Sequence, residues 1–405
     1  MKQSALFVKT LKEDPQGEES LNAKLLIRAG FVHKVMAGVY AFLPLGLRVM
    51  NKIESVIRKE MESVGGQELL MSSLQPKADW VKTDRWNNLD VLFRFTSHYS
   101  QNEYVLGPTH EEEVVPILKQ HIFSYRDLPI YVFQFQNKFR DEKRAKSGLL
   151  RGREFLMKDF YSFHADGSDL DNYYDIMAGV YKRVFDVLGI GDKTYFTFAS
   201  GGTFSKYSHE FQMIAPSGED TIYVCNKCNI AINEEVLESM NNACPECSSK
   251  ELKIEKAIEV GNIFKLKDKY SAPFNLQFKD ISGTTENVLM GCYGIGVSRL
   301  MGTIVEASYD NKGIIWPESI APFCYHLLEQ NPGEAKQIYE KMIEDKHEVL
   351  YDDRKIGLGE KFADADLMGI PIRLLVSSKT AGKIEVKKRK EEKTEIINYE
   401  NISKF

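Results

Sequence analysis

The sequence has no apolar run near the roughly 20 residues that span a bilayer, so we expect no membrane anchor. Its first residues, MKQSALFVKTLKED, lack a long apolar core. We therefore expect no signal peptide and a cytoplasmic location. Excess positive charge is also absent, because the formal net charge is −5. That balance argues against nonspecific coating of duplex DNA, although a local basic face could still bind RNA.

Cysteine is scarce, with six residues in 405, and four of the six form two CxxC pairs. The pattern is C-x2-C-x15-C-x2-C, made by Cys225, Cys228, Cys244 and Cys247. In a reducing compartment this spacing favours a tetrahedral zinc ribbon over disulfides. The alternatives are a ribbon without metal or four unligated thiols. Cys292 and Cys324 stand alone, and we expect both to be unligated.

Residues 139–155, FRDEKRAKSGLLRGREF, concentrate positive charge that the whole chain lacks. Six cations face three acids, the cations being Arg140, Lys143, Arg144, Lys146, Arg151 and Arg153. Alternating apolar residues at 130–140 and 153–164 predict two strands of an antiparallel hairpin. Arginines at its base suit a polyanion such as a nucleoside triphosphate, because the guanidinium fork binds phosphate oxygens in pairs. For the lysines of the loop, a solvated surface explains the charge equally well.

Other segments have clear periodicity. Apolar residues at helical spacing predict a helix over 45–64, and a strand over 67–76 follows. A helix with an acidic first turn is expected to begin near Thr109, and an amphipathic helix at 169–190. Residues 288–307 are expected to form a strand, a glycine-rich turn and a helix. Alternating elements beyond residue 321 predict a small α/β domain with a largely parallel sheet. The charged segment 383–396 is expected to be a solvated edge strand or hairpin.

The pattern F-R-x-E, a loop, then R-x-x-x-F resembles the second signature motif of class II aminoacyl-tRNA synthetases. MGCYGIGVSRL at 290–300 resembles their third motif, in which an arginine follows glycines at the start of a helix. The resemblance implies an α+β catalytic domain with an antiparallel sheet and a C-terminal α/β anticodon-binding domain. It also implies that the helix at 45–64 and the strand after it form the interface of a homodimer.

GPTHEEEV at 107–114 resembles the prolyl-tRNA synthetases of bacterial type, and the likeness extends over nearly the whole chain except residues 225–255. By this resemblance Thr109 and Glu111 hold the imino group of proline. The chemistry agrees, since a secondary ammonium has two N–H donors, which one carboxylate and one hydroxyl satisfy. The resemblance further implies that the proline pocket includes Asp159, Tyr161, Asn262, Phe264 and Cys292.

The same resemblance implies an ATP site formed by Arg140, Glu142, Arg151, Phe155, Glu259 and Arg299, with Arg140 and Arg299 in the catalytic step. Glu259, and after it Glu210, are the expected Mg²⁺ ligands, because Mg²⁺ takes one or two carboxylates besides phosphate oxygens. The implied reaction joins proline to tRNA(Pro) through a prolyl-adenylate, with positioning and electrostatics carrying the chemistry. His209 is expected to be structural.

The expected organisation is a catalytic domain in two parts, 1–218 and 259–318, a short insertion at 219–258, and an anticodon-binding domain at 319–405. Bacterial-type relatives commonly carry an editing domain of well over a hundred residues where this chain has the insertion. We therefore expect no hydrolysis of alanyl-tRNA(Pro) by this chain. Near the anticodon we expect Asp353, Arg354 and Lys361, although an exposed charged loop explains each as well. Lys387–Lys390 suit either an RNA backbone or a solvated edge.

Two other readings remain open. One is a noncatalytic synthetase paralogue that binds RNA, which the retained set of ATP residues disfavours. The other is a class II enzyme for threonine or serine, which the apolar pocket residues and the T-x-E arrangement at Thr109 and Glu111 disfavour.

Overall fold

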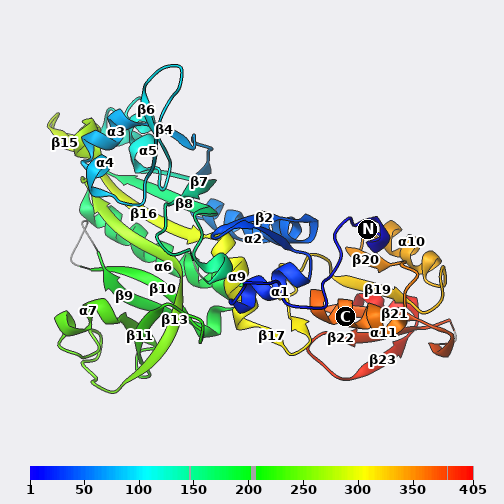
Figure 1. Cartoon of the computed structure of the whole chain (residues 1–405). Helices are drawn as coiled ribbons and strands as arrows, with labels where there is room; N and C mark the ends of the chain where they lie inside the picture. The colour runs from blue at the N-terminus through cyan, green and yellow to red at the C-terminus, as the bar shows by residue number, and fades with distance from the viewer. Residues whose placement is uncertain (146, 202–206, 381, 405) are drawn as a thin grey trace. The chain divides into compact units, whose positions relative to one another are not determined.

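The computed structural model describes residues 1–145, 147–201, 207–380 and 382–404 (Figure 1). The chain divides into two compact units. Unit 1 contains Met1–Met36, Tyr40–Ile53 and Ile304–Phe405, and unit 2 contains Ala37–Val39 and Glu54–Thr303. The grouping of the first 36 residues with the C-terminal part is not evident in the local sequence pattern, because it depends on contacts between segments far apart in the chain.

Unit 2 is built on a nine-stranded sheet whose hydrogen-bonded neighbours are mostly antiparallel, as the resemblance implied. In spatial order its strands are β10 (Tyr207–Ile214), β9 (Thr194–Ser200), β12 (Ile230–Asn233), β11 (Asp220–Cys225), β13 (Leu252–Lys267), β16 (Leu289–Gly296), β8 (Glu154–His164), β7 (Ile130–Phe139) and β3 (Gln67–Glu68).

The predicted hairpin is confirmed by β7 and β8, which pair antiparallel from Ile130 opposite Phe163 to Phe139 opposite Glu154. β8 pairs along its other edge with β16, where Cys292 lies opposite Tyr161. β16 in turn pairs with β13, where Phe264 lies opposite Cys292. These pairings bring segments more than 100 residues apart in sequence into adjacent rows of one sheet.

Five of the strands close into a ring. β13 pairs with β10, β10 with β9, β9 with β12, β12 with β11, and β11 again with β13. β11 and β12 belong to the expected insertion at 219–258. The insertion is therefore continuous with the catalytic sheet, because closing the ring requires both of its strands.

The long helix α6 (Gly167–Val187) packs against β8, β13 and β16 (Figure 1). Its buried side chains recur at helical spacing and include Tyr173, Met177, Val180, Tyr181 and Val184. Asp166 caps its start by accepting hydrogen bonds from the backbone N–H groups of Ser168 and Asp169. The apolar face of α6, with its helical period, is thus buried against one face of the sheet.

The predicted strand over 67–76 is wrong in extent, since it is split into β3 and β4 (Leu74–Pro76). β4 joins β6 (Glu103–Leu106) and β5 (Phe93–Thr96) in a separate three-stranded sheet. The two halves pair with different sheets, which residue periodicity does not reveal. Around them lie α3 (Lys77–Lys82), α4 (Arg85–Asn88), α5 (Glu111–Leu118) and α8 (Ser271–Phe274), with the hairpin of β14 (Gln277–Lys279) and β15 (Thr285–Asn287). The short helix α7 (Glu234–Leu237) packs instead against β9, β11 and β12.

Unit 1 contains a five-stranded sheet in the order β20 (Val349–Asp352), β19 (Tyr325–Glu329), β21 (Ile372–Val376), β22 (Ile384–Lys388) and β23 (Thr394–Ile397). The first three strands are parallel, and the charged segment forms the antiparallel hairpin β22–β23, both as predicted. The other elements are α1 (Leu21–Arg28), β1 (Val32–Met36), β2 (Val39–Phe42), β17 (Tyr309–Asp310), β18 (Gly313–Ile314), α10 (Lys336–Glu344) and α11 (Leu358–Met368).

Two helices contribute residues to both units. α2 (Pro44–Glu62) confirms the helix predicted over 45–64, and α9 (Val297–Ala307) follows β16 without a gap. The glycines expected in a turn therefore lie inside β16 itself. At Gly294 a Cβ would lie 2.7 Å from Oδ1 of Asn262, so glycine lets the neighbouring strand's side chain approach. Among the described residues, no helix combines the length and apolar character needed to cross a membrane.

Candidate active site

A cavity of about 220 Å³ lies where the loop between β7 and β8, the start of β11, β13 and α9 come together. Its walls include five of the six residues predicted for ATP, namely Arg140, Glu142, Arg151, Glu259 and Arg299, together with Leu150, Glu219, Asp220, Ala257 and Ile258. The sixth, Phe155, has its ring 5.1 Å below the guanidinium carbon of Arg140. The structure thus brings together residues from three distant segments that the sequence had grouped by motif alone.

Each arginine of this cavity has an acidic or carbonyl partner that orients it. Arg299 donates to the Glu259 carboxylate at 3.0 Å and to the Leu150 carbonyl at 2.9 Å. Arg151 donates to Glu142 at 3.1 Å and to Glu219 at 2.9 Å. Because these partners orient each guanidinium group, its remaining N–H groups can donate to phosphate oxygens in the cavity.

Arg140 is half-buried, as is Arg299. It donates to the Pro108 carbonyl at 3.4 Å, which connects the cavity with the segment that carries Thr109. Burial and the nearby charge of Arg299 lower the pKa of Arg140 from its usual value, though a guanidinium remains charged at neutral pH. Two half-buried cations held close together form a region that favours a polyanion.

Asp220 and Glu259 make another part of the cavity wall acidic, and Glu210 lies next to them. Gln212 donates to Glu210 at 2.9 Å and to Asp220 at 2.7 Å, and it lies opposite Glu259 in the β10–β13 register. Burial, and next the charge of Glu259, raise the pKa of Glu210 to about 8. Carboxylates in such proximity are the hard oxygen ligands that Mg²⁺ prefers, so Glu259 and Glu210 fit a magnesium ion shared with phosphate oxygens.

His209, the neighbour of Glu210, has a structural environment, as expected. Its Nδ1 lies 2.8 Å from the Tyr174 hydroxyl, which donates to the Ile263 carbonyl at 3.1 Å, and its ring stacks on Phe196 at 4.3 Å. Burial, followed by the charge of Lys265, lowers the pKa of His209 to about 4.

The residues predicted for proline gather around Glu111. Thr109 donates its hydroxyl proton to Oε2 of Glu111, and the Cys292 thiol lies 3.5 Å from Oε1. Burial, and next the charge of Glu111, raise the pKa of Cys292 well above its usual value, so this thiol stays protonated. Phe264 lies across from Cys292 and packs against the apolar core. A carboxylate flanked by a hydroxyl, a thiol and an aromatic ring can hold a small cationic group with apolar carbons.

Asn262 links this region to the ATP cavity. Its amide donates to Glu259 at 2.8 Å, and it lies opposite Gly294, which in turn lies opposite Asp159 on β8. The predicted proline and ATP residues therefore occupy adjacent rows of the same sheet.

A buried polar network under Glu111 was not predicted in full. Asp159 accepts hydrogen bonds from Tyr161 and Gln134, both at 2.9 Å, and forms an ion pair with Lys138 at 2.6 Å. Burial alone would raise the pKa of Asp159, but Lys138 and its other donors hold the value below normal. Lys138 is fully buried, and its position on a β7 face shared with Gln134 was the only available sequence signal.

His110 completes this network. Its Nε2 lies 3.0 Å from the Ser72 carbonyl, which can only accept, so Nε2 carries the proton. Nδ1 then accepts from Lys138 at 2.5 Å. Burial, and next the charge of Lys138, lower the pKa of His110 to about 4, which keeps the imidazole neutral. The backbone N–H of His110 donates to Tyr161 at 3.2 Å, so the network fixes the start of α5 and hence Glu111.

Arg85 is a second residue that the sequence did not indicate. It donates to both carboxylate oxygens of Glu112 at 3.0 Å and to Glu111 at 3.4 Å. Its guanidinium stacks over the rings of Trp80 at 4.9 Å and Tyr270 at 5.5 Å. Arg85 thus orients the carboxylate predicted to bind the imino group. In the sequence it is one arginine among many, with no motif around it.

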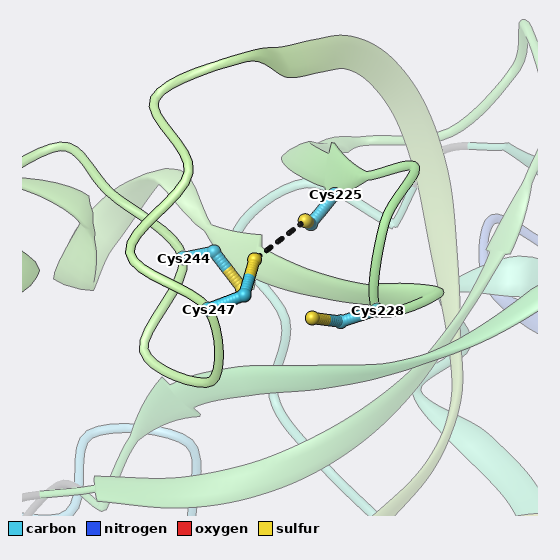
Figure 2. Close-up of side chains that lie close together, drawn as sticks. All are labelled: Cys225, Cys228, Cys244 and Cys247. Carbon is cyan, nitrogen blue, oxygen red and sulfur yellow. Dashed lines mark hydrogen bonds between the residues drawn. The ribbon is translucent and has the colours of Figure 1, made fainter.

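The four paired cysteines meet in space, and their side chains point toward one another (Figure 2). Their sulfur atoms all lie within 4.8 Å of one another, and Sγ of Cys225 is 3.7 Å from Sγ of Cys247. A tetrahedron with Zn–S bonds of about 2.3 Å has edges of about 3.8 Å, whereas a disulfide has an S–S bond of about 2.05 Å. The donor set and its dimensions therefore fit Zn²⁺ and not a disulfide.

The predicted anticodon residues lie in unit 1. Asp353 accepts from the backbone N–H of Ser4 at 3.0 Å and from its hydroxyl at 2.7 Å. Arg354 forks onto Asp352 at 2.8 and 2.7 Å. Lys361 is only 2% exposed, and its ammonium donates to two backbone carbonyls, which directs it away from solvent. Among the cations of the loop after β7, Lys146 lies outside the described residues.

Comparisons with known proteins match both parts of the chain. Residues 93–308 match the family model of the tRNA synthetase class II core domain (G, H, P, S and T), and residues 323–405 match that of the anticodon-binding domain. The fold resembles a crystal structure of prolyl-tRNA synthetase from Cryptosporidium parvum with halofuginone and AMPPNP. That similarity has a TM-score of 0.77 at 17% identity and covers 94% of this chain and 73% of the other.

Curated relatives are similar over nearly the full length. The proline–tRNA ligase of Sulfurimonas denitrificans is 37% identical over 94% of this chain and 93% of its own, and that of Ehrlichia chaffeensis is 40% identical over 96% of both. The proline–tRNA ligase of Staphylococcus saprophyticus is 31% identical over an alignment of 560 positions, although this chain has 405 residues. By these matches the chain belongs to the proline–tRNA ligases of the class II tRNA synthetase family.

Proposed function

We propose that this chain activates proline with ATP and transfers it to tRNA(Pro). The observation that carries the proposal is the cavity that Arg140, Arg151 and Arg299 share. Arg140 also donates to the Pro108 carbonyl, which connects this cavity with the segment of Thr109 and Glu111. Two arginines of the loop between β7 and β8 and one of α9 suit one triphosphate, and the Glu111 carboxylate with the Thr109 hydroxyl suits a secondary ammonium. The curated relatives named proline–tRNA ligase support the same reaction.

In the first step the proline carboxylate attacks the α-phosphorus of ATP, and pyrophosphate leaves as the prolyl-adenylate forms. Arg140 offsets the negative charge on the α-phosphate, while Arg151 and Arg299 hold the leaving phosphates. Glu111 and Thr109 hold the imino group so that the carboxylate points toward Arg140. A side-chain nucleophile is not required, because positioning and fixed charge carry the step. Mg²⁺ held by Glu259 and Glu210 would neutralise charge on the phosphates.

In the second step a hydroxyl of the terminal adenosine of tRNA attacks the prolyl carbonyl and AMP leaves. The domain at 323–405 suits recognition of the anticodon, since single-stranded bases are read by stacking and edge hydrogen bonds. Asp353 and Arg354 stay candidates for that contact, whereas the burial of Lys361 favours a structural role.

We further propose a homodimer, with α2 in the interface, and a cytoplasmic location, where tRNA and reduced thiols occur together. The four clustered cysteines would hold one structural Zn²⁺.

Proline-dependent exchange between ATP and pyrophosphate tests this function. Exchange with proline and not with serine or threonine supports it. Exchange with serine or threonine alone would show that the protein is a class II enzyme for that amino acid. No exchange with any amino acid would point to a noncatalytic RNA-binding paralogue.

We also propose that the chain does not hydrolyse alanyl-tRNA(Pro). The position of the editing domain in longer relatives is filled by residues 219–258, whose strands β11 and β12 belong to the catalytic sheet itself. Incubation of purified Ala-tRNA(Pro) with the protein should leave the ester at its spontaneous rate of decay. Rapid deacylation would overturn this proposal and leave the aminoacylation proposal standing.

A further inference from the structure

We propose that Zn²⁺ at Cys225, Cys228, Cys244 and Cys247 holds the acidic wall of the ATP cavity in place, so that metal occupancy sets the affinity for ATP. The inference rests on the proposed function only in its choice of nucleotide. It goes beyond a structural zinc site because it connects the thiolates to the phosphate-binding residues through three strands.

Two turns with the same geometry present the four thiols. Asn229, which follows the second cysteine of the first pair, has φ +55°, and its N–H donates to the Cys225 carbonyl at 2.9 Å. Ser248, which follows the second pair, has φ +59°, and its N–H donates to the Cys244 carbonyl at 2.8 Å. Each turn therefore directs two sulfurs to one point, and the two turns face each other (Figure 2). Two matched turns around one tetrahedron-sized gap are what a four-thiolate metal site requires.

The first connection from this cluster to the cavity is β11. The strand ends at Cys225 and begins at Asp220, a residue of the cavity wall, about 17 Å away along an extended chain. Glu219, just before the strand, accepts from Arg151 at 2.9 Å. A metal at one end of β11 thus anchors the strand whose other end positions a predicted ATP arginine.

The second connection is β13, which pairs with β11 from Leu252 opposite Cys225 to Ala257 opposite Asp220. Ala257, Ile258 and Glu259 then follow in the cavity wall. Because the paired ends lie beside the thiols, fraying that begins there would propagate along both strands toward the wall.

The third connection is β12, which begins two residues after Cys228 and ends at Asn233. The Asn233 amide lies 3.4 Å from Oε2 of Glu210, the second expected magnesium ligand. The strands β11, β12 and β13 therefore each lead from the thiol cluster to an acidic residue in the cavity wall or next to it.

Apolar packing in this segment is modest. The local core consists of two small clusters, one with Ile222, Val224, Ala231 and Ala257 and one with Ile232, Val236 and Leu237. The turn that carries Cys247 is exposed. Where a small element has little core, the free energy of binding a structural metal supplies its folding free energy. The metal is therefore expected to decide whether the ends of β11 and β13 stay paired.

The test measures metal and nucleotide separately in the full-length protein. Elemental analysis should find one Zn²⁺ per chain, and titration calorimetry with a non-hydrolysable ATP analogue should give its affinity. Cys247→Ser should lose the metal and weaken nucleotide binding at least fivefold, while proline's KM in the exchange assay changes less than twofold. Cys324→Ser, a lone thiol in unit 1, is the matched control and should change neither quantity.

Two further measurements keep the outcome clear if Cys247→Ser folds poorly. Cys247→His restores a zinc ligand and should recover both metal and nucleotide affinity. Chelation of the wild-type protein, followed by addition of Zn²⁺ alone, should lower and then restore that affinity. Absence of zinc from the purified protein, another metal in its place, or loss of zinc with unchanged nucleotide affinity would each overturn the inference. Absence of exchange in a zinc-loaded, nucleotide-binding protein would instead refute the proposed function alone.

Discussion

Replacement of Arg85 by methionine tests how the protein holds Glu111, the carboxylate proposed to bind the imino group of proline. The guanidinium contacts both oxygens of Glu112 at 3.0 Å, and Glu112 is only 1% exposed. Removing it leaves a buried carboxylate with the Thr83 hydroxyl, at 2.7 Å, as its remaining side-chain donor. Breaking a buried ion pair in this way costs about 3–5 kcal/mol. We therefore expect Arg85→Met to lower the free energy of unfolding by about 3 kcal/mol at pH 8, measured by urea denaturation.

The pH dependence of that loss follows from Glu112. Burial already raises the pKa of this carboxyl, and loss of the arginine would raise it further. The variant can relieve the buried charge by binding a proton, so the penalty should shrink as the pH falls toward 5. The double variant Arg85→Met/Glu112→Gln should be more stable than Arg85→Met at pH 8, because it removes the stranded charge along with its partner.

The kinetic consequence concerns Glu111, which lies 3.4 Å from the same guanidinium nitrogen. Loss of one charge-assisted hydrogen bond is worth about 1.5 kcal/mol, or roughly a tenfold rise in the KM for proline. The KM for ATP should change less than twofold. Arg94→Met is the matched control, since Arg94 stacks on Trp86 at 5.3 Å and donates to the Leu89 carbonyl. A destabilisation below about 1 kcal/mol, or an unchanged proline KM, would refute the positioning role of Arg85.

Three further predictions concern other parts of the chain. Arg140→Ala should reduce proline-dependent exchange roughly 10²–10³-fold while tRNA binding in a filter assay stays intact, and the reverse pattern would contradict its role at the α-phosphate. Gly294→Ala should reduce exchange, because the added Cβ would clash with Cε of Met157 and lie 2.7 Å from Oδ1 of Asn262 and so displace that amide; unchanged kinetics would show that the amide is not needed there. Burial lowers the pKa of His326 to about 4, so the unfolded chain binds more protons below pH 6.5 and stability should fall between pH 7.5 and 5, by about 2 kcal/mol for this residue. Urea titrations of His326→Gln should show a pH slope reduced by that amount, and an unchanged slope would contradict it.

The amino-acid sequence by itself determined what depends on local pattern. Alternation at 130–139 and 154–164 specified the hairpin, because a strand with one buried face has period 2 wherever it lies. The order of the two arginine motifs grouped Arg140 and Arg299 before any contact between their segments was visible. Cysteine spacing likewise specified a four-thiol cluster, since two short turns present two sulfurs each.

Tertiary structure decided what depends on partners distant in the chain. Arg85 and Lys138 are unremarkable cations in sequence, and only burial against Glu112 and Asp159 gives them a function in positioning. Lys361 was expected at an RNA-binding surface because it is a cation in a charged segment, yet its ammonium donates to two buried backbone carbonyls. The insertion reads as a separate ribbon, but β11 and β12 close a ring with the catalytic sheet. In each case the stabilising contact joins two segments that lie far apart in the sequence. A local stretch of sequence contains only one of the two and therefore cannot predict the contact.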